Sequence, residues 1–238
     1  MTGRTQRSPD GTWILDKTMK RDLFGEIQLG RLAPDGPQVV RRLTRRSAWL
    51  LRPLARLFAW REARALRRLA GMDGIPQLIA YDGRTLYRSF IPGRMVFGTR
   101  PRDPAFYKAC KALLRQVHRR GVTHNDAAKR VNWVIRPDGR PALLDFQLSL
   151  TWRRRGKLFR VFAYEDLRHV VKHKRFNCGL KALTRMERRV LGRKTLVTRT
   201  WNTLYQGPYY FVTRRILHWQ DREGFGPHRK IQAPNEPS

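Results

Sequence analysis

The order of apolar and polar residues divides the first part of the chain into short strands around one helix. Apolar residues recur at helical spacing after Pro53, which can open a helix at its first position, and Gly71 follows the last of them. Asp82-Gly83-Arg84 is a strong turn signal between two apolar runs. The expected elements are strands at 23–32 and 38–44, a helix at 53–69, and a hairpin of strands at 75–81 and 85–90.

The pattern becomes more helical after Ile91-Pro92-Gly93, which indicates a hinge. Asp103 can cap a helix that has Pro104 in its first turn, and an apolar stripe continues to Val117. We therefore expect an α+β fold of two lobes, a small β-rich lobe with one main helix and a mostly helical lobe. The expected boundaries are a disordered leader at 1–20, an N-terminal lobe at 21–93, a C-terminal lobe at 94–225 and a frayed tail at 226–238.

The composition is that of a folded protein with a very large positive charge. Hydrophobic residues make up 41% of the 238 residues, which argues against a disordered polycation. The 51 Lys and Arg residues outnumber the 18 Asp and Glu residues, and the formal net charge is +33. This excess repels itself in a compact state, so it points to an anionic partner such as nucleic acid, acidic lipid, phosphorylated glycan or nucleotide. A solvated basic surface without such a partner is the alternative.

Targeting and cross-linking signals are sparse in this sequence. The first ten residues carry Arg4 and Arg7 with no apolar stretch behind them, and no run approaches the roughly 18 apolar residues of a membrane span. Cys110 and Cys178 are the only cysteines, which indicates neither a disulfide framework nor a zinc site. We expect a cytoplasmic protein whose basic face can make peripheral contact with the anionic surface of the inner membrane.

Asn132 and Asp145 flank a second expected hairpin. A two-residue turn at Asp138-Gly139 would place them opposite each other on neighbouring strands, with both side chains on one face. A slip of one residue would separate them. Because amide and carboxylate oxygens suit Mg²⁺ bound to substrate phosphates, Asn132 and Asp145 are the expected metal ligands.

Asp126 lies in the loop before this hairpin, and Lys129 follows closely. A loop carboxylate can accept the proton of a hydroxyl group or orient that group. Lys129 can neutralise the charge of a phosphoryl group in transfer. Phosphoryl transfer depends mainly on such positioning and charge stabilisation, so these two residues are the catalytic candidates.

His124-x-Asp126, Asn132 and Asp145-Phe146 resemble the catalytic loop and the metal-binding motif of protein kinases. The segment is most similar to the bacterial RIO and Kdo (lipopolysaccharide) kinase-like group, which includes proteins described as serine/threonine kinases. The resemblance covers about residues 20–180. It implies a protein-kinase-like fold, ATP with Mg²⁺ or Mn²⁺, Asp126 as the catalytic aspartate, and Asn132 and Asp145 as metal ligands. Gln147 stands where the kinase motif has glycine.

Glu62 lies on the apolar stripe of its helix, with no basic residue three or four positions away. A carboxylate that faces the core needs a partner from elsewhere. In kinases this partner is a strand lysine that binds the nucleotide phosphates. The matching strand here has no lysine, and its only basic residues are Arg41 and Arg42. Arg41 shares a face with Val39 and Leu43, so it is the expected partner rather than Arg42. A solvated Glu62 is the alternative.

Two weaker signals complete the site. Gly25 and Gly30 are candidates to flank a loop that covers the nucleotide phosphates, although this spacing alone has low specificity. Asp166 either braces the catalytic loop from a helix, as a buried aspartate does in kinases, or is an ordinary helix charge.

The leading functional hypothesis is an enzyme that transfers the γ-phosphoryl group of ATP to a hydroxyl. A protein Ser/Thr and a lipopolysaccharide-core sugar both remain open as acceptors. The absence of the strand lysine motivates a second hypothesis, a pseudokinase that binds nucleotide as a scaffold. A ribosome- or nucleic-acid-binding basic protein ranks last, because no nucleic-acid motif accompanies the charge.

Overall fold

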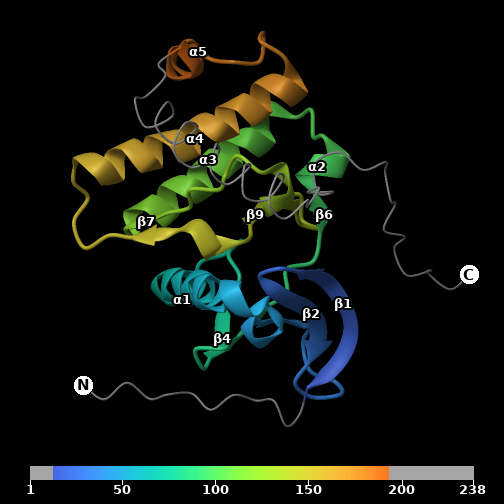
Figure 1. Cartoon of the computed structure of the whole chain (residues 1–238). Coiled ribbons are helices and arrows are strands. Elements are labelled where there is room, and N and C mark those ends of the chain that lie inside the picture. The colour runs from blue at the N-terminus through green and yellow to red at the C-terminus, as the bar shows by residue number, and fades with distance from the viewer. Residues whose placement is uncertain (1–12, 193–238) are drawn as a thin grey trace, which may run out of the picture. The chain divides into compact units, whose positions relative to one another are not determined.

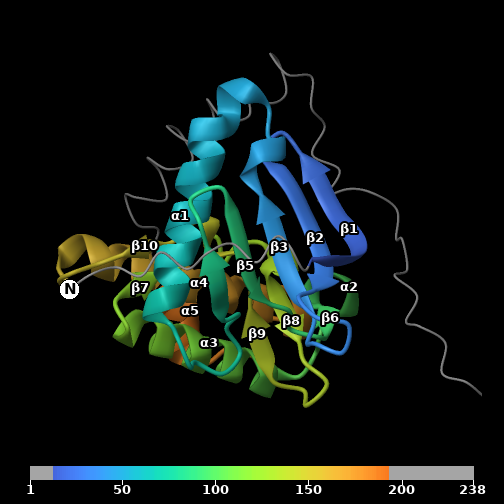
Figure 2. The ribbon, with the colours of Figure 1, turned by 90° about the horizontal axis from the view of Figure 1, so that it is seen from below.

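The computed structural model describes residues 13–192, and its first half is a five-stranded antiparallel sheet with one long helix. The elements are β1 (Ile14–Asp22), β2 (Gly25–Arg31), β3 (Val39–Leu43), α1 (Arg52–Arg68), β4 (Leu78–Tyr81) and β5 (Thr85–Ser89). The strand order is β1-β2-β3-β5-β4. Helix α1 contacts β4 and β5 and runs beside that end of the sheet (Figure 2). The strands, helix and hairpin expected from the sequence are thus confirmed.

The second half is a mixed region of helices and small sheets. Its strands are β6 (Arg94–Met95), β7 (Val122–Thr123), β8 (Trp133–Ile135), β9 (Pro141–Leu143) and β10 (Leu150–Thr151), and its helices are α2 (Val96–Thr99), α3 (Pro104–Arg119), α4 (Lys157–Cys178) and α5 (Arg185–Gly192). One small sheet has the order β6-β8-β9, and β7 pairs with β10. Short 3-10 helices cover Thr44–Arg46, Trp49–Leu51, Arg130–Asn132 and Phe146–Leu148. Helices α3, α4 and α5 lie together on the side away from the five-stranded sheet (Figure 1).

Helix α3 shows how the sequence fixes these elements. Asp103 caps it, because its carboxylate accepts a hydrogen bond of 2.8 Å from the backbone N–H of Ala105, and Pro104 occupies the first turn. The apolar stripe that follows is buried against α4 and β9. Among residues 13–192, no helix combines the length and the apolar composition that a membrane span requires.

One hydrophobic core joins the two regions. Side chains from the last turns of α1 pack with those of α3, β8, β9 and α4 in a single cluster. Its largest fully buried members are Trp133, Tyr107, Phe146, Leu66, Leu69, Leu114 and Leu143. Because α1 also contacts the 3-10 helix that begins at Phe146, the helix of the first region is held against the segment that carries Asp145.

Strand β1 was not predicted from the sequence, and its presence corrects the expected disordered leader at 1–20. Residues 14–20 were expected within a disordered leader, yet Ile14–Asp22 forms β1 and pairs with β2. Most of its side chains are exposed and its pairing has two irregularities, so neither apolar alternation nor burial marks it. Backbone hydrogen bonds to β2 hold this edge strand in place. Residues 1–12, the part of the expected C-terminal lobe after residue 192, and the expected tail at 226–238 lie outside the described residues.

A buried carboxylate ties β1, β2 and the turn after β3 together. Glu26 is almost fully buried and accepts hydrogen bonds from Arg21 Nε at 2.9 Å, from Arg46 Nη1 at 2.7 Å and from the amide of Gln28. Burial alone would raise the pKa of Glu26, but the hydrogen bonds from Arg46, Gln28 and Arg21 outweigh it and lower the pKa to about 2. The ionised carboxylate is therefore a stabilising part of this sheet.

We predict that Glu26→Gln lowers the free energy of unfolding at pH 7 by about 1–3 kcal/mol, because the variant loses charge-assisted hydrogen bonds. The folded-state pKa lies below the ordinary value of 4.5, so this stability is present above pH 4.5 and is lost as the pH falls toward 2. Urea unfolding of both proteins between pH 7 and pH 3 would show the difference shrinking. Asp35→Asn, in an exposed turn, is the control. A pH-independent difference would contradict the assignment.

Candidate active site

A buried carboxylate on α4 holds the loop between β7 and the 3-10 helix at Arg130–Asn132. Asp166 accepts hydrogen bonds from the backbone N–H groups of His124 at 2.8 Å and of Asn125 at 2.9 Å. The ring of His118 on α3 lies 3.0 Å from the same carboxylate. Asn125 has a φ of 63°, so its backbone takes a left-handed conformation that costs energy and persists because the surroundings fix it. Of the two interpretations of Asp166, the loop brace is confirmed.

His124 supports this loop with both ring nitrogens. Its Nδ1 lies 3.2 Å from the backbone nitrogen of Asp126, and its Nε2 lies 2.8 Å from the carbonyl oxygen of Leu144. The backbone N–H can only donate, so Nδ1 must accept and Nε2 must carry the hydrogen. The ring also packs edge-on against Phe146, with 4.7 Å between the centroids. With both nitrogens engaged in this way, His124 positions the loop.

Asp126 lies at the centre of the loop with Asn132 and Lys129 beside it. Its Oδ2 accepts a hydrogen bond of 3.0 Å from Asn132 Nδ2 and lies 3.0 Å from Lys129 Nζ. The amide of Asn132 also donates to the backbone oxygen of Asp126 at 3.1 Å. Burial raises the pKa of Asp126, with the nearby charge of Asp145 adding to the effect and Lys129 opposing it. The structure therefore brings together three of the predicted site residues.

Asp145 is placed differently from the expected hairpin geometry. In the observed register Trp133 faces Leu143 and Ile135 faces Pro141. The partner of Asn132 is therefore Leu144, whose backbone N–H donates to the backbone oxygen of Asn132 at 2.8 Å. The predicted pairing of Asn132 with Asp145 is off by one residue. The reason is the turn: Arg136 and Arg140 close a three-residue loop in which Gly139 has a φ of 77°, instead of a two-residue turn.

A change of backbone conformation follows the end of β9. Asp145 has a φ of 61° and a ψ of 73°, and this left-handed residue precedes the 3-10 helix Phe146–Leu148. Burial would raise the pKa of Asp145, but the positive charges of Arg42, Lys129 and Arg88 outweigh it and lower the pKa. Its buried Oδ1 has no hydrogen-bond partner among the described residues. The negative charge of Asp145 raises the pKa of Asp126, so the two carboxylates lie near enough to repel each other.

Arg42 of β3 is the residue that connects Glu62 to Asp145. Its Nη1 lies 3.6 Å from Glu62 Oε2 and donates a 2.9 Å hydrogen bond to Gln147 Oε1, and its Nη2 lies 3.7 Å from Asp145 Oδ1. Glu62, with a side chain only 1% exposed, also pairs with Arg88 Nε of β5 at 3.1 Å. The expectation that Glu62 needs a partner from another element is confirmed.

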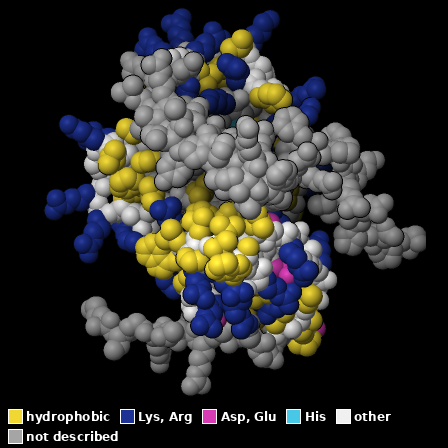
Figure 3. Space-filling view, in the orientation of Figure 1, with side chains coloured by type: hydrophobic (Ala, Val, Ile, Leu, Met, Phe, Trp, Pro, Cys, Tyr) yellow, Lys and Arg dark blue, Asp and Glu magenta, His cyan; other side chains and the backbone are white. Residues whose placement is uncertain are grey.

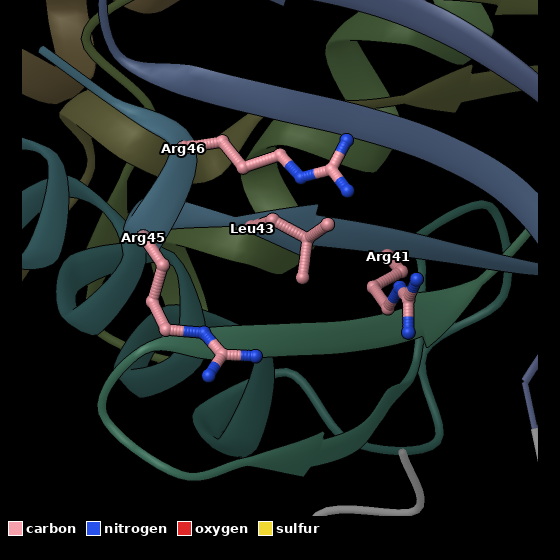
Figure 4. A pocket seen from close by; sticks show the side chains of 4 residues that line it. All are labelled: Arg41, Leu43, Arg45 and Arg46. Atoms are coloured by element: carbon pink, nitrogen blue, oxygen red, sulfur yellow. The ribbon is translucent and has the colours of Figure 1, made fainter. Parts of the chain in front are cut away.

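The choice of Arg41 as that partner is wrong. Both Val39 and Val40 are buried, because the sheet carries apolar side chains on both faces, so burial does not identify the face toward α1. Val40 and Arg42 face the helix, whereas Arg41 lies on the other side. There its guanidinium carbon lies 4.4 Å from the centroid of the Trp13 ring, and its N–H groups donate to Gln28 Oε1. Figure 4 shows Arg41 with Leu43, Arg45 and Arg46, which line a pocket on that side.

Gly25 and Gly30 do not flank a loop. Residues 25–31 form β2, and the turn before it consists of Leu23 and Phe24. Each glycine permits a close approach of backbone, since a Cβ atom would come within 2.4 Å of the Leu43 oxygen at Gly25 and within 2.2 Å of the Ile14 oxygen at Gly30. Both glycines are therefore explained by sheet packing, and the phosphate-loop prediction is wrong for residues 25–30.

Sequence reasoning missed three residues of this site. Arg88 and Arg42 both pair with Glu62, and Gln147 accepts a hydrogen bond from Arg42. His118 contacts Asp166. Strand alternation could have found Arg88, because it lies opposite Val40 in the β3–β5 pairing and so on the same face. The contacts of Gln147 and His118 depend on how distant elements pack and have no local signal.

We predict that Asp166→Asn destabilises the fold by about 2–4 kcal/mol, because an amide NH₂ would replace an oxygen that accepts a buried backbone N–H. Hydrogen exchange at the amides of His124 and Asn125 should accelerate more than exchange elsewhere. Glu165→Gln is the matched control: Glu165 is the neighbouring residue of α4, and its carboxylate pairs with Arg168 on the same helix. Equal exchange in both variants would contradict the role of Asp166 as a brace.

The site thus combines two carboxylates, an amide and a lysine on one side with a pair of largely buried arginines, Arg42 and Arg88, on the other. No cluster of three or more His, Cys, Asp or Glu side chains that could hold a metal occurs among residues 13–192. The set therefore offers oxygen ligands for a cation that also binds its substrate, rather than a closed metal cage. No protein-family model matches the sequence, and no curated protein is significantly similar to it.

Proposed function

We propose that this protein is an ATP-dependent phosphotransferase with a protein-kinase-like fold that moves the γ-phosphoryl group to a hydroxyl acceptor. The observation that carries the proposal is the arrangement of Asp126, Asn132 and Lys129 in a braced loop, next to the end of a hairpin where Asp145 lies. A five-stranded sheet with one helix, followed by a helical region that holds this loop, agrees with such a fold. The acceptor is either a protein Ser/Thr or a lipopolysaccharide-core sugar.

The residues present fit a divalent cation bound with ATP. Asp145 keeps a low pKa and has a buried carboxylate oxygen without a hydrogen-bond partner among the described residues, which suits a cation. Asn132 uses its NH₂ group on Asp126, which leaves its amide oxygen as a second ligand. Mg²⁺ or Mn²⁺ held by Asn132 and Asp145 would neutralise phosphate charge.

Asp126 would act on the acceptor. Its Oδ2 is oriented by Asn132 and Lys129, and the carboxylate can accept the proton of the acceptor hydroxyl. A bond forms between the acceptor oxygen and the γ-phosphorus, the bond from phosphorus to the ADP oxygen breaks, and the hydroxyl proton passes to Asp126. Lys129, whose side chain is half exposed, would stabilise the charge of the phosphoryl group.

A second candidate function follows from Arg42. If the resemblance to kinases holds, Arg42 takes the role of their strand lysine, and it contacts both Asp145 and Gln147. Arginine is larger than lysine and pairs with two groups at once, so this contact can hold Asp145 away from a metal. A pseudokinase that binds nucleotide without transferring phosphate is the alternative that this geometry favours. Charge is the only support for a nucleic-acid-binding function.

We predict that Asp145→Ala and Asp126→Asn impair different steps. Asp145→Ala should abolish the Mg²⁺-dependent part of ATP binding in calorimetry.

Asp126→Asn should keep the fold and ATP binding but lower turnover about 10²-fold or more, because it removes the proton acceptor. Since burial raises the pKa of Asp126, wild-type turnover should fall on the acid side at a pH above its ordinary 3.8.

Turnover would be followed as ADP release with a serine-containing peptide mixture or lipopolysaccharide core oligosaccharide as acceptor. Asp138→Asn, in the exposed turn of the same hairpin, should change neither measurement. Undiminished turnover of Asp126→Asn, or unchanged metal-dependent binding by Asp145→Ala, would defeat the corresponding assignment. ATP binding by the wild type without transfer to either acceptor would support the pseudokinase.

We further predict that Arg42→Ala lowers the affinity for ATP about tenfold or more, because a charge-assisted contact to phosphate is lost. Arg41→Ala is the matched control, since Arg41 is the next residue on the same strand but points to the opposite face. Fluorescence titration with a labelled nucleotide would measure both. Tighter nucleotide binding by Arg42→Ala would show that the arginine blocks the site and would favour the pseudokinase.

A further inference from the structure

An apolar stripe runs along the outer face of α1 and the turn before it. Leu50, Pro53, Leu54, Leu57 and Trp60 recur every three or four residues, and Trp49 lies beside the first of them. Trp49 is 73% exposed and Leu50 is 71% exposed. The opposite face of the same helix is the buried one, where Ala55, Ala59, Glu62, Ala63 and Leu66 lie. Figure 3 shows apolar side chains gathered over α1.

Arginines frame this stripe. Between residues 45 and 72 the sequence contains eight arginines and a single acidic residue, Glu62, which is buried and paired. Arg64 continues the outer face after the apolar part, and its guanidinium lies 5.2 Å from the Trp60 ring. The exposed surface of this segment therefore carries no negative side chain.

We propose that α1 and the turn at Trp49–Leu51 form a docking surface for an anionic lipid bilayer. Tryptophan prefers the interface between water and lipid, because its ring is apolar and its N–H can bond at the headgroup level. An amphipathic helix with an arginine-rich polar border lies in that interface with its apolar face inward. Arginines at the border attract anionic headgroups, and the net charge of +33 adds a long-range attraction.

The charge pattern favours lipid over other occupants. A nucleic acid would use the arginines but gain little from exposed leucines and prolines. A second copy of the chain would bring its own eight arginines against these, with one buried glutamate to offset them, so like charges would face each other across the contact. An anionic bilayer matches both the apolar stripe and its basic border. The docking surface does not depend on the catalytic proposal, since none of its exposed residues lies in the candidate active site.

The test is co-sedimentation of the full-length protein with vesicles of phosphatidylcholine alone and with vesicles that also contain phosphatidylglycerol, at about 0.15 M salt. The double variant Trp49→Ser with Leu50→Ser should bind the anionic vesicles about tenfold more weakly or worse. Leu158→Ser with Leu180→Ser removes two other well-exposed apolar side chains and should change binding less than about twofold. Neither double variant alters the charge, and all four positions are exposed, so the thermal unfolding temperature should stay unchanged.

A second pair of variants separates local docking from net charge. Arg52→Gln with Arg56→Gln should weaken vesicle binding more than Arg153→Gln with Arg154→Gln, although both lose two charges from exposed positions. Equal losses in the two pairs, or no loss with the Trp49 and Leu50 variant, would overturn the proposal. So would a wild-type dimer in sedimentation equilibrium that this apolar variant alone dissociates, or retention of an oligoribonucleotide in preference to anionic vesicles.

Discussion

The guanidinium of Arg42 is the interaction on which the candidate site depends, because it connects the sheet, the helix and the hairpin. It reaches Glu62 of α1, Asp145 after β9, and Gln147 in the following turn. A buried cation is costly unless several anionic or polar groups surround it. Burial would lower the pKa of Arg42, yet the charges of Glu62 and Asp145 outweigh this and raise it, so the group stays ionised. Each partner is therefore held by the need to satisfy one charge.

This dependence explains how a site made of distant residues can be preorganised. Asp166 fixes the backbone of the loop that carries Asp126, while Arg42 fixes the position of Asp145 relative to α1. Both devices use buried charge–dipole or charge–charge contacts, whose strength increases as water is excluded. Asp126 and Asp145 consequently face opposite shifts: burial raises the pKa of the first, and neighbouring cations lower that of the second. Two carboxylates with different proton affinities are what an acid–base group and a metal ligand require.

The sequence predicted local elements well and side-chain orientation less well. Turn residues and apolar spacing located the hairpins, α1 and α3, because these signals act over a few residues. The face of β3 was misassigned because Val39 and Val40 are both buried, so alternation carries no information about which side meets α1. The Asn132 hairpin slipped by one residue because Asp138-Gly139 belongs to a three-residue loop. Strand β1 escaped notice since its side chains are mostly exposed, so no apolar alternation marks it.

Part of the large positive charge is ordered by three buried glutamates. Glu26 is held by Arg21 and Arg46, Glu62 by Arg42 and Arg88, and Glu187 by Lys111 and Lys174. In each case one interior carboxylate binds two cations that come from different elements. Such a carboxylate orders two basic side chains yet neutralises only one of them. Each triad by itself therefore leaves one positive charge, which Asp145 offsets in the case of Glu62. Three acidic residues that could balance the surface are thereby placed inside, and the exposed face of α1 carries only arginine and apolar side chains. A chain built in this way remains folded while presenting a positive field to any anionic partner.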